Sequence, residues 1–261
     1  MLKKLLKYDL KWVLKVLSIF YALAIIFAMG GRLMLEVDNS LLFKVLGGIT
    51  LGLSAGMLIG CIINTFLRSW ARFVKNVYKD ESYLTHTLPV LKKTIYNAKL
   101  ISAIIATLLT GIVIILCLFI AYYSENNMMQ LKNWLEISLG SAASIKIIIL
   151  TSINLFLEVI YIIVLGYAAI IIGHKSNGRK FLKSVVYGFG MYSLTQVCSL
   201  IFLFIAGWIN SDIMKLINSA SMPQLNVVYY VLYFSLALYL LFIIFYYFLG
   251  KKILEKGVNV D

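Results

Sequence analysis

Six apolar stretches divide this chain, and each is long enough to cross a lipid bilayer. A hydrocarbon core of ~30 Å requires about 20 helical residues. The stretches that meet this length lie near residues 13–31, 44–67, 100–122, 147–173, 185–208 and 227–249. Hydrophobic residues make up 62% of the 261 residues and charged residues 13%, which is far from the composition of a soluble domain. The sequence therefore predicts an all-α polytopic membrane protein with a single transmembrane domain over residues 1–261.

Positively charged residues are distributed unevenly among the ends and loops of this arrangement. Of the 24 Lys and Arg residues, 19 fall in the two termini and the loops on the same side of the membrane, and 5 fall in the other loops. Because cytoplasmic loops are enriched in Lys and Arg, both termini are predicted to be cytoplasmic. The net charge of +13 is mostly a topology signal, and no segment is long enough to form a soluble nucleic-acid-binding surface.

Residues 1–12 have the pattern of an amphipathic elbow helix. Leucines occupy one face, and the opposite face carries Lys3, Lys4, Lys7, Lys11 and Lys15. We expect this helix to lie on the anionic inner leaflet and to turn into the first span; a cleaved secretory signal is the less favoured alternative. Asp9 projects from the apolar face, which predicts a basic partner inside the protein, although a solvated end of that face is the alternative.

The second span carries a regular row of glycines. They repeat every four residues, at Gly48, Gly52, Gly56 and Gly60. Such a row removes side chains from one helix face and favours close packing against another span or a second protomer. The segment Gly52–Gly56 also matches the GxSxG motif of serine hydrolases, but Ser54 lies in the middle of a membrane helix and both histidines fall in loops. A nucleophile elbow requires a strand before it and a histidine within reach, so we predict no catalytic role.

Other motifs of enzyme chemistry are equally incomplete. Gly173–Lys180 has the two-glycine spacing of a P-loop, but it follows a membrane helix and lacks the terminal Lys-Ser/Thr pair that binds phosphate and magnesium. The three cysteines lie in three separate spans, at Cys61, Cys117 and Cys198, which is not the pattern of a disulfide framework or a metal site. We therefore expect no catalytic residues, no metal and no cofactor bound by this chain, and a membrane-embedded enzyme is the least favoured class.

Glu158 is the only acidic residue deep within a span, and Asn154 lies one turn before it. An ionisable residue at this depth is a candidate functional residue. An interhelical hydrogen bond is the alternative that we favour.

The loop 68–99 interrupts the apolar pattern with the segment KNVYKDESYLTHTLPV. Basic residues at helical spacing continue out of the second span, at Arg68, Arg72, Lys75 and Lys79. A helix over 44–79 would be about 54 Å long at ~1.5 Å per residue, so its end would leave the membrane. Asp80 is then a candidate N-cap of a short helix that begins with Glu81 and ends before Pro89.

Apolar side chains accompany the charges of this loop, at Tyr83, Leu84, Leu88 and Val90. Apolar groups held away from the bilayer suggest a protein partner. A loop that folds onto itself is an equally weighted alternative.

Two short motifs resemble a known family. YLTHTLPV at 83–90 is similar to the loop after the second span in permease subunits of bacterial ATP-binding-cassette exporters of the type-2 class, and LLKYDLK at 5–11 is similar to their N-terminal elbow helix. The resemblance implies a coupling helix that docks on a separate ATPase subunit. Its residues would be Asp80, Glu81, Ser82, Tyr83, Leu84, Thr85, His86, Thr87, Leu88 and Pro89. Ser82 stands where the family often has glycine.

The same resemblance implies a complex in the bacterial plasma membrane. Two ATPase subunits would hold ATP and magnesium, and two permease protomers, identical or related, would move a peptide, drug or lipid-like cargo outward. It also implies that residues 209–226 dip back toward the membrane, and that a cavity in the fifth span is lined by Thr195, Gln196 and Ser199. A stand-alone secondary carrier remains the alternative function.

Overall fold

The computed structural model describes residues 2–37, 40–87, 89–123, 127–130, 132–133, 136, 142–176, 178–209, 213–214 and 225–257. These residues contain helices and no strands, and six helices are long and apolar enough to cross a membrane, which confirms the all-α polytopic prediction. The chain divides into two compact units, residues 1–134 and 135–261.

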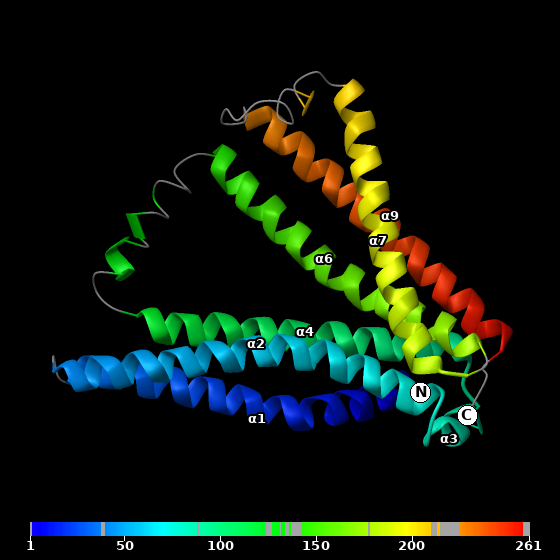
Figure 1. The fold of residues 1–261 in the computed structure, drawn as a ribbon, viewed down its shortest axis with the longest axis horizontal. Coiled ribbons are helices and arrows are strands. Elements are labelled where there is room, and N and C mark those ends of the chain that lie inside the picture. The colour runs from blue at the N-terminus through cyan, green and yellow to red at the C-terminus, as the bar shows by residue number, and fades with distance from the viewer. Residues whose placement is uncertain are drawn as a thin grey trace. The chain divides into compact units, whose positions relative to one another are not determined.

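Unit 1 consists of three long helices, α1 (Leu2–Val37), α2 (Leu41–Val77) and α4 (Lys92–Tyr122), and a short helix, α3 (Ser82–Thr87). Figure 1 shows the three long helices side by side, and α1 packs against both α2 and α4. Small residues dominate one buried cluster, in which Ala24, Ala28 and Cys117 pack around Leu58. Small side chains allow membrane helices to approach closely.

Hydroxyl groups link the three long helices of unit 1 within this core. The Thr110 hydroxyl of α4 lies 2.7 Å from Tyr21 Oη of α1 and 2.7 Å from Thr65 Oγ1 of α2. Ser54 Oγ of α2 donates a hydrogen bond of 2.9 Å to the Ala24 carbonyl oxygen of α1. Ser54 is therefore a buried helix-packing residue within a continuous helix, and the GxSxG match has no nucleophile-elbow geometry.

The N-terminal region differs from the expected elbow. Helix α1 is continuous for 36 residues, so there is no break between residues 12 and 13 where a turn was predicted. The amphipathic pattern itself is confirmed, because the five lysines are exposed while Asp9, Val13 and Leu17 are buried. Burial of this face against α2 and α4 explains the difference, since the same apolar stripe continues from the N-terminus into the span.

The glycines that allow close approach are not the ones in the predicted row. A Cβ atom built on Gly47 would lie 2.8 Å from the Leu35 side chain and 3.1 Å from the Gly31 carbonyl oxygen. At Gly48, Gly52 and Gly56 a Cβ would meet no described atom within 4 Å, and at Gly60 it would meet only the Phe20 ring, at 3.5 Å. Neither α1 nor α4 therefore packs on the first three members of the row within unit 1. The second-protomer alternative remains a prediction.

Unit 2 is built around α6 (Ala142–Lys175), which packs against both α7 (Lys180–Ile209) and α9 (Leu225–Lys256). The turn between α6 and α7 contains Gly178 and Arg179, both with positive φ angles, of 74° and 44°. The P-loop-like segment is thus a helix end, a turn and a helix start, and His174, which was expected in a loop, lies in the last turn of α6. Most of the expected re-entrant segment 209–226 lies outside the described residues.

Gly173 allows the closest contact between α6 and α7. A Cβ at this position would lie 2.2 Å from Ser184 Oγ and 2.5 Å from Ser184 Cα. We therefore expect Gly173→Ala to destabilise the protein by about 1–3 kcal/mol, as overpacking typically does. The matched control is Gly190→Ala in α7, where a Cβ meets nothing within 4 Å. Thermal unfolding of the two purified variants provides the comparison, and equal stability would show that the contact at Gly173 is not tight.

Candidate functional site

The candidate site is the segment 78–91 that connects α2 to α4, together with the helix ends behind it. Helix α2 runs for 37 residues, or about 55 Å at ~1.5 Å per residue, and ends two residues before the predicted Lys79. Tyr78 caps it, with a backbone N–H that donates 2.9 Å to the Val74 carbonyl oxygen. The Tyr78 ring is only 2% exposed and packs edge-on against Phe73, which also contacts Tyr96. Burial raises the pKa of the Tyr78 phenol. The packing of its ring against Phe73 also fixes the start of the loop.

Helix α3 has an inward face and an outward face. Ser82 and Thr85 are buried, whereas the side chains of Tyr83 and Leu84 are 77% and 66% exposed. The interpretation in which the loop buries its apolar residues on itself is therefore wrong for these two. Asp80, Thr87 and Pro89 are also exposed, while the His86 side chain and Leu88 lie outside the described part of the chain.

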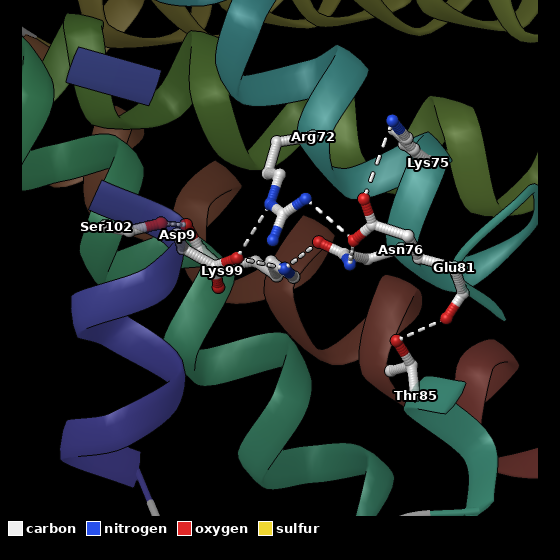
Figure 2. A network of polar contacts seen from close by, with 8 residues as sticks. All are labelled: Asp9, Arg72, Lys75, Asn76, Glu81, Thr85, Lys99 and Ser102. Atoms are coloured by element: carbon white, nitrogen blue, oxygen red, sulfur yellow. Dashed lines mark hydrogen bonds and ion pairs between the residues drawn. The ribbon is translucent and has the colours of Figure 1, made fainter. Parts of the chain in front are cut away.

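Glu81 links this loop to α2. The predicted helix begins one residue later than expected, at Ser82, so Glu81 precedes the helix instead of occupying its first turn. Its carboxylate accepts hydrogen bonds from Arg72 Nη1, at 2.8 Å, and from Asn76 Nδ2, and Lys75 Nζ lies 3.5 Å away. Its carbonyl oxygen accepts a hydrogen bond of 2.9 Å from Thr85 Oγ1. Figure 2 shows Glu81 in contact with both α2 and α3.

Asp9 of α1 confirms the prediction of a basic partner, and it has two. Its Oδ1 atom accepts a hydrogen bond of 3.0 Å from Arg72 Nε of α2 and another from Lys99 Nζ of α4. The Lys99 ammonium also donates to Asn76 Oδ1. Asp9 and Lys99 are 2% and 4% exposed. We call Asp9, Arg72, Lys75, Asn76, Glu81 and Lys99 the charge cluster; Figure 2 shows that its residues come from α1, α2, α4 and the loop.

The electrostatics of the charge cluster favour a fixed geometry. Two carboxylates face the Arg72 guanidinium, which bridges Asp9 and Glu81, and the Lys99 ammonium balances the second negative charge. The Trp12 ring of α1 covers the same region, with the guanidinium carbons of Arg68 and Arg72 at 4.9 Å and 5.3 Å from its centroid. Buried charges persist when they are paired and hydrogen-bonded. The cluster therefore ties the loop to the ends of three long helices.

Lys99 and Asn76 are the members that the sequence did not single out. Lys99 lies directly before the third span, and Asn76 lies one turn beyond Arg72. The apolar position of Asp9 required a cation but did not specify which one. The position of Lys99 at the boundary of an apolar span could have indicated this partner, because a basic residue there can turn inward to an acidic side chain.

The polar residues of unit 2 have separate roles. Asn154 Nδ2 donates a hydrogen bond of 3.2 Å to the Leu232 carbonyl oxygen of α9, and Ser235 Oγ donates one of 2.6 Å to Asn154 Oδ1, so Asn154 links α6 to α9. Thr195 Oγ1 is buried and lies 2.8 Å from Tyr246 Oη. Thr195 therefore takes part in a hydrogen bond between α7 and α9, and its predicted role in lining a cavity stays a prediction.

Gln196 is exposed, Ser199 and Glu158 are half-buried, and a cavity at Gln196 and Ser199 remains a prediction. Within the described ranges, no group of three or more His, Cys, Asp or Glu residues could hold a metal ion.

The fold and the site define a class of protein: a polytopic α-helical membrane protein with a polar loop that exposes two apolar side chains and is anchored to three of the long helices. Comparison of the chain with protein-family models, curated proteins and solved structures finds no match.

Proposed function

We propose that this chain is the transmembrane permease subunit of an ATP-binding-cassette exporter, and that segment 78–91 docks on a separate ATPase subunit. One observation carries the proposal. Helix α3 presents Tyr83 and Leu84 outward, while Glu81, directly before it, is bound into the charge cluster. The loop thus has an apolar contact surface on one side and a connection to α1, α2 and α4 on the other.

This arrangement suits the transmission of force. A partner that moves α3 also moves Glu81, and through Arg72 and Asn76 it moves Asp9 and Lys99. Conformational switches commonly work by rigid-body movement of packed elements. In this proposal the ATPase subunits hold ATP and magnesium, the permease holds neither, and the helices convert between packings that move an amphipathic cargo outward across the bacterial plasma membrane.

Purification of the tagged full chain from its native membrane tests the proposal. We expect a soluble protein with a P-loop to co-purify and the complex to hydrolyse ATP, whereas the chain alone does not. A chain that transports its cargo in reconstituted vesicles without ATP or any co-purifying protein would instead be a stand-alone secondary carrier.

The glycine row supports a second permease protomer in the same complex. Gly48, Gly52 and Gly56 expose a face of α2 that no described residue covers within 4 Å of a built Cβ. In a membrane, a face without side chains favours close helix association. We assign this face to the partner protomer.

A leucine at Gly52 tests this assignment against a matched change on the same helix. Gly52→Leu is expected to leave the protomer folded and to weaken its association with the second protomer, because only the open face changes. Gly47→Leu is expected to unfold unit 1, because even a Cβ at Gly47 meets Leu35 at 2.8 Å. Size-exclusion chromatography in mild detergent reports both results, and a Gly52→Leu protein that assembles like the parent would remove the glycine row from the interface.

A further inference from the structure

Arg68 and Trp12 meet at the level where the apolar runs of unit 1 end. Trp12 directly precedes the first apolar run, and Arg68 directly follows the second. The structure brings the two side chains together, with the Arg68 guanidinium carbon 4.9 Å from the centroid of the Trp12 ring. Lys99, which directly precedes the third apolar run, binds Asp9 near the same end of α1. The three apolar runs therefore end at one level, which in a membrane is the headgroup region.

Arg68 differs in its partners from Arg72, which lies one turn further along α2. The Arg72 guanidinium contacts both Asp9 and Glu81. Arg68 is half-buried, and it forms no ion pair or hydrogen bond within the described part of the chain. The Trp12 ring attracts the Arg68 cation but does not neutralise it. The N–H groups of the Arg68 guanidinium are therefore available to bind an anion.

Acidic side chains are scarce at this end of unit 1. Residues 1–15 and 68–99 contain 12 Lys and Arg residues but only three Asp and Glu residues. Two of these carboxylates are bound in the charge cluster. The third belongs to Asp80, which lies beyond the end of α2, more than two helical turns past Arg68. An anion for Arg68 therefore has to come from outside this end of the unit.

An anionic phospholipid fits the chemistry of this position. Lipids surround membrane helices at the headgroup level, so their binding requires no enclosed cavity. The guanidinium fork of an arginine binds two phosphate oxygens at once, and an indole ring suits the boundary between headgroups and acyl chains. Lys15 is exposed and lies one turn from Trp12 on α1, so a second cation can approach the same headgroup. Two cations beside one phosphate favour a lipid with a net negative charge over a zwitterionic lipid.

We propose that Trp12, Lys15 and Arg68 form a binding site for one anionic phospholipid at the N-terminal end of unit 1. Arg68 binds the phosphate, Lys15 supplies a second positive charge, and the Trp12 ring packs beside the glycerol and the upper part of an acyl chain. The site is separate from segment 78–91 and does not depend on an ATPase. It is more specific than a general attraction of the α1 lysines to an anionic leaflet, because it requires one arginine of α2.

Native mass spectrometry of the full chain in detergent tests the proposal by counting the lipids that stay bound. Phosphatidylglycerol should bind as a discrete adduct, and phosphatidylcholine with the same acyl chains should bind at least ~10-fold more weakly. Arg68→Gln is expected to lower the affinity for phosphatidylglycerol at least ~10-fold, a loss of about 1.4 kcal/mol. Lys93→Gln removes the same charge from an exposed position at the start of α4 and should change this affinity less than ~3-fold. Equal losses in the two variants, or equal binding of the two lipids, would overturn the proposal.

A second measurement uses the unaltered protein, in case Arg68→Gln does not fold. Phenylglyoxal modifies accessible guanidinium groups, and mass spectrometry locates the product. Phosphatidylglycerol should protect Arg68 and leave the modification of Arg179, an exposed arginine in the turn between α6 and α7, unchanged. Protection of both arginines, or of neither, would contradict a discrete site. Protection of Arg68 by free glycerol phosphate at the same concentration would also contradict the proposal, because the site would then bind a soluble phosphate compound instead of a lipid.

Discussion

Lys99→Met is expected to destabilise unit 1 by about 3–5 kcal/mol, the usual effect of removing one partner from a buried ion pair. Methionine keeps most of the volume of lysine but removes the ammonium group. The Asp9 carboxylate, which is 2% exposed, then keeps only the bond from Arg72, and Asn76 loses its donor. Thermal and denaturant unfolding of the purified protein provide the measurement.

Two further variants distinguish the loss of the Lys99 ion pair from the effect of replacing a lysine side chain as such. Lys79→Met makes the same substitution at an exposed lysine that follows α2, and it should change stability by less than ~0.5 kcal/mol. The double variant Asp9→Asn with Lys99→Met removes both charges, so most of the lost stability should return. If Lys99→Met is as mild as Lys79→Met, or if the double variant is less stable than either single one, the charge cluster is not a coupled unit.

The sequence predicted the helices well because their signal is local. Each apolar run is roughly as long as the hydrocarbon core is thick, or longer. The basic residues at helical spacing after residue 67 correctly predicted that α2 continues past its apolar run. The continuous α1 was missed because a lysine face fits both an interfacial helix and the exposed side of a longer one. Backbone continuity at residues 12–13 depends on packing against α2 and α4, which no local pattern reports.

For long-range contacts, the sequence predicted the type of partner that a residue needs but not which residue provides it. Asp9 on an apolar face required a cation, but Lys99 is 90 residues away and Arg72 is 63, and spacing does not select between such partners. The glycine row showed that one face of α2 lacks side chains, yet α1 packs instead against Gly47, outside that row. The hydrogen-bond partner of Thr195 was likewise not predicted, because Tyr246 lies on a helix 51 residues further along.

If segment 78–91 docks on an ATPase subunit as proposed, aspartate at both Tyr83 and Leu84 is expected to abolish that interaction without affecting the fold. Both side chains are exposed on α3, so the chain itself loses no buried contact. In a complex the same positions are desolvated, and a carboxylate there has no compensating partner. The loss of a central apolar contact typically weakens an interface by about 2 kcal/mol or more, or ~30-fold, and two such changes should remove detectable binding.

Conservative changes at the same two positions are the matched control. Tyr83→Phe with Leu84→Met keeps the apolar surface and changes only a hydroxyl and a branch point. This variant should bind the ATPase nearly as well as the parent. If it fails as completely as the aspartate variant, the loss reflects a disturbed loop and not the burial of charge in an interface.

The most direct test of the proposed docking loop is the amount of ATPase that co-purifies with equal amounts of the tagged chain from the membrane. Three forms should be compared: the parent, Tyr83→Phe with Leu84→Met, and Tyr83→Asp with Leu84→Asp. We expect equal abundance in the membrane for all three, bound ATPase for the first two, and none for the third. Undiminished ATPase on the aspartate variant, with hydrolysis still stimulated by the cargo, would contradict the assignment of segment 78–91 as the element that couples this protein to ATP hydrolysis.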